Sequence, residues 1–60
     1  MSFSRRVKSH LALRGEGIYE FAGRLGVTYI TLWKWLKCPT TKQIEKIAKA
    51  LDVTVDELEG

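Results

Sequence analysis

Residues 18–37 read IYEFAGRLGVTYITLWKWLK and contain two short apolar stripes on either side of a tight turn. The first stripe consists of Phe21, Ala22 and Leu25. The second stripe consists of Leu32, Trp35 and Leu36. Both stripes have the spacing of one face of an α-helix. We therefore predict two helices, at residues 18–25 and 29–37, with Trp35 in the core and Trp33 exposed.

The turn between these helices has residues suited to ending one helix and beginning the next. Gly26 can adopt the left-handed backbone conformation that commonly ends a helix. Thr28 can accept a hydrogen bond from the first turn of the second helix through its side-chain oxygen. Ala22 is small enough to let two crossing helices approach closely.

A further helix is predicted before this stretch, over residues 4–14, with Ser2 or Ser4 as its N-cap. Val7 and Leu11 are four residues apart and therefore share one helix face. The same buried side is completed by Phe3 and by Leu13 or His10. Gly15 and Gly17 end this helix and separate it from the next.

Two more helices are predicted after residues 18–37, at residues 41–51 and 55–58. The first buries the stripe Ile44, Ile47, Ala48 and Leu51. Both begin with a capping box, a Thr followed three residues later by Gln or Glu. These pairs are Thr40 with Gln43 and Thr54 with Glu57. Val53, Val55 and Leu58 are expected to close the core, with Asp52 in a left-handed conformation.

These residues together resemble the phage-repressor and Cro-type family of helix-turn-helix DNA-binding domains. The resemblance covers about residues 5–58 of the chain. The matching positions are Phe21, Ala22, residues 25–28, Leu32, Trp35, Ile44, residues 47–51 and residues 53–58. It implies an all-α fold, a compact five-helix bundle of the lambda-repressor-like type. Residues 1–60 would form one DNA-binding domain, with the central helix-turn-helix at residues 18–37.

The sequence departs from the family pattern at two places. Family members usually begin the second helix with a Ser or Thr cap and a Gln that binds a DNA phosphate, but this chain has Gly17 and Ile18. The side chain of Ile18 has no hydrogen-bonding group, so a phosphate would bind only backbone N–H groups there. The connection that begins with Cys38 and Pro39 is also about three residues shorter than is usual.

The charge distribution would suit a polyanionic partner approached from one side. Residues 1–42 contain eight Lys or Arg and two acidic residues, a local net charge of +6. Residues 43–60 contain two Lys and five acidic residues, a local net charge of −3. A small domain that is merely basic and well solvated has the same composition, so charge alone does not choose between these interpretations.

Several classes of protein are excluded by composition. Sixty residues suffice for one domain at most, and the single Cys38 and single His10 exclude an internal disulfide and a multi-cysteine or cysteine–histidine metal cluster. The chain has no apolar run long enough to cross a membrane, no signal peptide and no catalytic constellation. We therefore expect a cytoplasmic protein that is not an enzyme and binds no cofactor or metal.

The family resemblance also implies the position of the DNA and the residues that contact it. The helix at residues 29–37 would enter the major groove of double-stranded DNA. Base contacts would come from Tyr29, Ile30, Trp33 and Lys34. The DNA backbone would be contacted by Arg5, Arg6, Arg14, Thr28, Lys37, Thr40 and Lys42. The resemblance further implies a bacterial or phage-encoded transcriptional regulator, associated with the nucleoid when bound, which forms a weak homodimer on DNA.

An alternative function is open at this point. Base edges are usually contacted by polar side chains, whereas Tyr29, Ile30 and Trp33 form an apolar patch on the predicted recognition helix. Such a patch is typical of protein interfaces, in which Trp and Tyr are common anchors. The same fold would then be an antirepressor-like interaction module that binds another regulator through these three residues.

Overall fold

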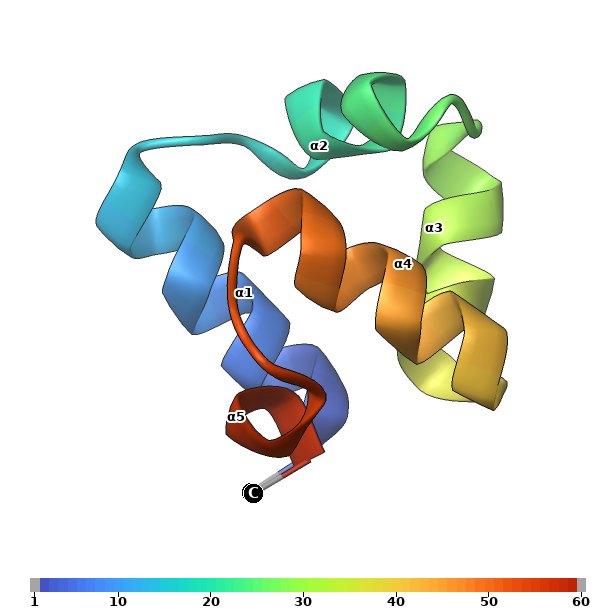
Figure 1. Cartoon of the computed structure of the whole chain (residues 1–60). Helices are drawn as coiled ribbons and strands as arrows, with labels where there is room; N and C mark the ends of the chain where they lie inside the picture. Colours follow the sequence, from blue (N-terminus) through green and yellow to red (C-terminus); the bar gives the residue numbers. More distant parts are fainter. Residues whose placement is uncertain (1, 60) are drawn as a thin grey trace.

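The computed structural model describes residues 2–59, which form five α-helices and contain no β-strand. The helices are α1 (Phe3–Arg14), α2 (Ile18–Leu25), α3 (Tyr29–Lys37), α4 (Thr41–Leu51) and α5 (Val55–Glu59). In Figure 1, α4 crosses the middle of the molecule, α1 and α3 flank it, and α2 lies across the top. The predicted all-α class is confirmed, and the predicted helix boundaries agree with the structure to within one residue.

The turn between α2 and α3 has the backbone conformation expected from its residues. Gly26 has φ 74° and ψ 28°, and its N–H donates to the carbonyl oxygens of Ala22 and Gly23. The hydroxyl oxygen of Thr28 accepts a hydrogen bond of 3.1 Å from the backbone N–H of Thr31. Backbone groups at the end of α2 and at the beginning of α3 therefore find hydrogen-bond partners within a three-residue connection. This connection fixes the direction in which α3 leaves α2.

Helix α4 is capped at both ends as predicted. The side chains of Thr40 and Gln43 exchange hydrogen bonds with each other's backbone N–H, at 3.3 Å and 3.0 Å. At the other end Asp52 is left-handed, with φ 58° and ψ 43°, and its N–H donates to Ala48 and Lys49. Asp52 is the one described residue other than glycine with positive φ.

Replacement of Asp52 with Gly is expected to stabilise the fold by about 0.5–1 kcal/mol. Glycine adopts the left-handed conformation without steric cost, and the change also removes a negative charge from the carboxyl end of α4. Urea unfolding monitored by circular dichroism measures the difference. The variant Asp52→Asn removes the charge and keeps the side chain, so it separates the two contributions. A glycine variant less stable than the parent would show that the Asp52 carboxylate stabilises the fold.

One hydrophobic core joins all five helices. Its buried side chains are Val7, Leu11, Phe21, Ala22, Leu32, Leu36, Ile47, Ala48, Leu51 and Leu58. Ile44 is also buried, while Val53 and Val55 are half-buried and pack against the core. The predicted stripes of α1, α2 and α4 therefore point inward as expected. Across residues 2–59, no helix has the length and apolar character needed to cross a bilayer.

The predicted positions of the two tryptophan side chains are wrong. Trp35 is half-buried at the edge of the core, because the buried positions of α3 are Leu32 and Leu36, one turn apart. Trp33 was expected to be exposed but is also half-buried and packs against the core. Of the two alternatives for the buried side of α1, His10 is half-buried and Leu13 is 85% exposed. Leu13 lies two residues after Leu11 and therefore about 200° around the helix from the buried face.

A set of contacts that the sequence did not suggest attaches the α1–α2 loop to the end of α4. Glu16 accepts two hydrogen bonds from Arg24, at 2.7 Å and 3.0 Å. Arg24 also donates to the carbonyl oxygen of Ala50 at 3.0 Å. Arg14 donates to the carbonyl oxygen of Leu51 at 2.9 Å. These arginines satisfy the last carbonyls of α4, which have no partner within the helix.

Candidate nucleic-acid interface

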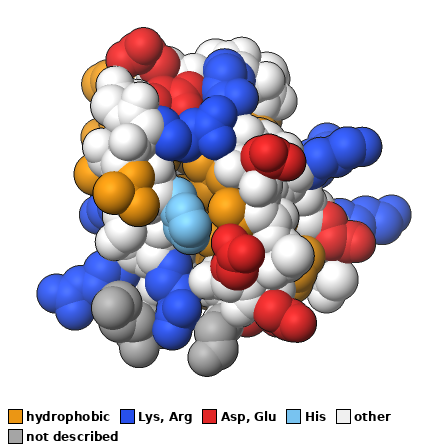
Figure 2. Space-filling model, turned by 60° about the vertical axis from the view of Figure 1, so that its left-hand side comes forward, with side chains coloured by type: hydrophobic (Ala, Val, Ile, Leu, Met, Phe, Trp, Pro, Cys, Tyr) orange, Lys and Arg blue, Asp and Glu red, His pale blue; other side chains and the backbone are white. Residues whose placement is uncertain are grey.

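The two helices that flank α4 carry positive charge without any acidic residue. Helices α1 and α3 contain six Lys or Arg side chains and no Asp or Glu. These are Arg5, Arg6, Lys8, Arg14, Lys34 and Lys37. In Figure 2, acidic and basic side chains adjoin at the top, whereas one basic side chain projects alone from the lower left of the molecule. Both ion pairs found among residues 2–59 involve Glu16.

A row of aromatic rings connects α2, α3 and α1 across the surface. Tyr19 of α2 stacks on Tyr29 of α3, with ring centroids 4.2 Å apart and planes inclined by 11°. Tyr29 meets Trp33 edge to face at 6.0 Å. The ammonium group of Lys8, on α1, lies 4.4 Å from the centroid of the Trp33 ring. These stacking and cation–π contacts hold the outer edges of three helices together.

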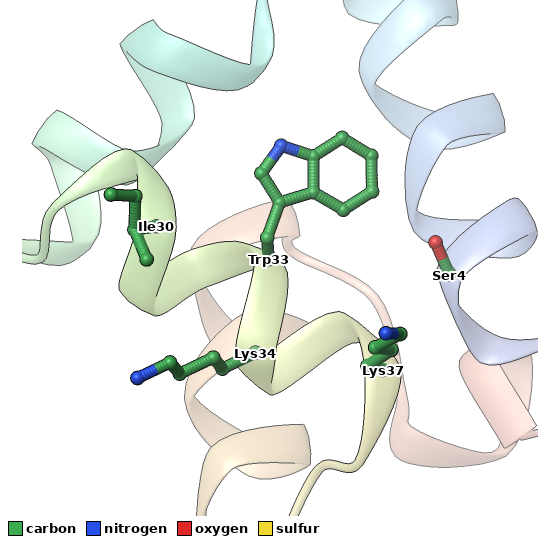
Figure 3. A pocket seen from close by; sticks show the side chains of 5 residues that line it. All are labelled: Ser4, Ile30, Trp33, Lys34 and Lys37. Carbon is green, nitrogen blue, oxygen red and sulfur yellow. The ribbon is translucent and has the colours of Figure 1, made fainter.

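A surface pocket of about 430 Å³ lies between the outer face of α3 and the beginning of α1. Its lining residues are Ser4, Ile30, Trp33, Lys34 and Lys37. In Figure 3 the indole of Trp33 projects between α3 and α1 and forms the back of the pocket. Lys37 lies on the same side of Trp33 as Ser4, whereas the Lys34 side chain extends away from Trp33 on the side where Ile30 lies. The pocket lining therefore combines two apolar side chains, those of Ile30 and Trp33, with two lysines.

The four residues predicted to contact bases lie together on this face, but they differ in accessibility. Ile30 is 67% exposed and Lys34 is exposed. Tyr29 and Trp33 are half-buried and occupied in the aromatic row. A side chain that packs against neighbouring rings has little freedom to enter the major groove of DNA. Ile30 and Lys34 are therefore the most available of the four.

Three of the residues predicted to contact the DNA backbone are exposed; two of them lie around the same face, and the third follows α3 closely along the chain. Lys37 lines the pocket at the end of α3. Arg5 is exposed and three residues from Lys8, so both share one side of α1. Lys42 is exposed in the first turn of α4, which follows α3 after a connection of three residues.

Arg6 and Arg14 are directed to other parts of the molecule. Arg6 donates to the carbonyl oxygen of Glu57 in α5, at 3.3 Å. Arg14 is bonded to the end of α4, and it lies ten residues along α1 from Ser4. That separation corresponds to about 15 Å along a helix axis. The structure therefore does not bring these two arginines to the face formed by α3 and the beginning of α1.

The hydroxyl groups of Thr28 and Thr40, also predicted as backbone contacts, cap helices. Thr28 donates its hydroxyl hydrogen to Thr31 at 2.9 Å and accepts from the backbone of the same residue. The Thr40 hydroxyl accepts from the backbone N–H of Gln43. These groups position the beginnings of α3 and α4 rather than projecting freely.

Sequence reasoning missed Ser4, Lys8 and Tyr19 as parts of this face. Ser4 and Lys8 are one helical turn apart, so their shared side was visible in the sequence. What the sequence did not indicate is that this side of α1 packs next to Trp33. Tyr19 was recognised as outward-facing, but its stacking partner belongs to another helix.

Comparisons with models of protein families, with curated protein sequences and with solved structures give no match to this chain. Within residues 2–59, no three His, Cys, Asp or Glu side chains gather as a metal site requires. The functional interpretation therefore depends on the charge, the exposed groups and the helix arrangement described above.

Proposed function

We propose that this chain is a sequence-specific double-stranded DNA-binding domain of the lambda-repressor-like type, which regulates transcription as a repressor or Cro-like protein. In this proposal α2 and α3 form the helix-turn-helix, and α3 enters the major groove. The observation that carries the proposal is the exposed cationic face made by α3 and the beginning of α1. A polyanion is the partner that such a face favours, and the short capped turn supports the position of α3.

Base contacts are assigned to the most accessible side chains of α3. Ile30 is suited to apolar contact with a thymine methyl group, since its side chain is largely exposed. Lys34 follows one turn later and is suited to the O6 and N7 acceptors of guanine. Tyr29 and Trp33 support these two side chains through the aromatic row.

Phosphate contacts are assigned to cations at the borders of the same face. Lys37 ends α3, Arg5 and Lys8 project from the beginning of α1, and Lys42 lies in the first turn of α4. Such contacts set the orientation of the protein on the duplex without reading its sequence.

The proposed assembly is two copies on one operator. Helix-turn-helix domains bind half-sites about 34 Å apart, one turn of the duplex. We propose a homodimer that forms on DNA, in the cytoplasm and at the nucleoid of a bacterial host.

The decisive first experiment is titration with random-sequence duplex DNA at low and moderate salt. About four phosphate contacts predict an affinity loss on the order of a hundredfold between about 50 and 200 mM salt. Tryptophan fluorescence provides the signal, because Trp33 lies in the face assigned to DNA. Binding that is insensitive to salt, or undetectable at the lower concentration, would contradict the proposal.

A second candidate is an antirepressor-like module that binds another regulator through Tyr29, Ile30 and Trp33. The observation that favours it is the 67% exposure of Ile30 beside an apolar pocket. Binding of that kind would tolerate salt and would be weakened by Ile30→Ala. Ile30 is a better probe than Trp33, because its truncation leaves the core intact.

A further inference from the structure

The pocket on α3 has the composition of a small-ligand site. Ligand pockets of about 300–1,000 Å³ are typically lined by apolar and aromatic side chains with a few polar groups. This pocket falls within that range, with Ile30 and Trp33 as its apolar wall. It has five lining residues, whereas a stable protein interface uses about 20–30 residues on each side. The small size favours a small molecule over a second protein as its occupant.

The charged side chains at the pocket indicate which kind of small molecule would bind there. Both Lys34 and Lys37 line it, with Lys37 on the Ser4 side of Trp33 and Lys34 on the Ile30 side, and Lys8 lies on the Trp33 ring. Among the described residues, none of these lysines has an acidic side chain within ion-pair distance. A ligand with an apolar body and one negative end complements both features, since it covers the indole and supplies a counter-charge.

We propose that the pocket binds an apolar monocarboxylate, such as a medium-chain fatty acid, and that this ligand competes with DNA. The carboxylate binds at the side of the pocket where Figure 3 shows Lys37 and Ser4. The hydrocarbon chain lies over Trp33 toward Ile30. Ile30 and Lys37 are seven residues apart on α3, about 10 Å along the axis, which suits a chain of medium length.

The competition follows from the position of the pocket and rests on the proposed function. Ile30, Lys34 and Lys37 line the pocket, and the same three side chains are assigned to base and phosphate contacts. A ligand seated there occupies the outer face of α3, so the protein cannot hold ligand and DNA together. The carboxylate would therefore act as a release signal for the regulator.

The first test is titration of the full chain with decanoate, below its micelle concentration and without DNA, followed by amide and indole NMR. The expected result is saturable shifts at the Trp33 indole N–H, Ile30 and Lys37. Decanol, which has the same chain without the charge, is expected to bind several-fold more weakly. Equal shifts with both compounds, or shifts spread over the whole domain, would overturn the proposed carboxylate site.

Three substitutions locate the two ends of the ligand. Lys37→Ala is expected to weaken decanoate on the order of fivefold and to leave decanol unchanged. Lys34→Ala removes the same charge from the same helix at the other end, and its effect is expected to be smaller. Ile30→Glu changes a largely exposed position, preserves the fold and is expected to abolish decanoate binding. Equal effects of the two lysine substitutions would contradict the proposed orientation.

A final arm separates this proposal from the DNA-binding proposal. Decanoate is added to the complex with random-sequence duplex, and decanol is added at the same concentration as the control. Displacement by decanoate alone supports both the site and the competition. DNA binding without any decanoate shifts overturns the ligand site and leaves the proposed function in place. Decanoate binding by a chain that does not bind DNA supports the pocket and overturns the release mechanism.

Discussion

Replacement of Leu32 with Ala is expected to leave most of the chain unfolded at 25 °C. The Leu32 side chain is fully buried in the core cluster, on the helix that packs against both α1 and α2. Truncation of a buried leucine costs about 3–5 kcal/mol. A chain of this length has a total stability of about 3–9 kcal/mol, and small single cores lie near the lower end. The loss is therefore comparable to the whole stability of the fold.

Urea unfolding followed by circular dichroism measures the free energy of unfolding of the Leu32→Ala variant and of the parent chain. Leu13→Ala is the matched control, because it makes the same chemical change on a side chain that is 85% exposed. Its effect is expected to lie within about 0.5 kcal/mol of the parent. A Leu32→Ala variant that remains fully helical, with an unchanged urea midpoint, would contradict the position of Leu32 in the core.

Reversal of charge at Lys34 and Lys37 is expected to abolish DNA binding while the fold persists. Both side chains are exposed on α3, so glutamate is tolerated there. The double variant Lys34→Glu, Lys37→Glu loses two phosphate or base contacts and places two negative charges against the duplex. We expect a loss of about a hundredfold or more at low salt, because like charges in an interface add to the lost attraction. Fluorescence or gel-shift titration measures the affinity.

The control for this variant is Lys46→Glu with Lys49→Glu on α4. These lysines are also exposed and three residues apart, and both double variants change the net charge from +3 to −1. The α4 pair is not part of the proposed interface, so its effect is expected to be within severalfold. Equal losses in the two variants would show that net charge controls affinity, and α3 would then have no special role.

The helix boundaries were predictable because the signals for them are local. Left-handed backbone at Gly26 and Asp52, and side-chain caps at Thr28 and Thr40, depend on a few adjacent residues. The apolar period within each helix is equally local. The candidate site was predictable in part for the same reason, since Ile30, Lys34 and Lys37 share a helix and their spacing sets their common face.

The positions of the two tryptophans could not be predicted from spacing. Periodicity places both Leu32 and Trp35 on the inner side of α3, but the fully buried positions are Leu32 and Leu36, and Trp35 only packs against them. Trp35 consequently extends to the edge of the core, with Lys46 6.0 Å from its ring centroid. Trp33 becomes half-buried because α1 packs beside it, a contact between segments far apart in the chain.

The sequence by itself determined five helices, their ends, most of the core and the separation of charge along the chain. Each of these depends on residues within about one helical turn, or on simple counting. Only the tertiary structure decided which cationic side chains stay available at the surface and which bind groups on other helices. Arg6 and Arg14 bind carbonyl oxygens of α5 and α4, whereas Lys8 lies on the indole of Trp33. Long side chains reach partners on other helices, and packing of those helices selects the partner.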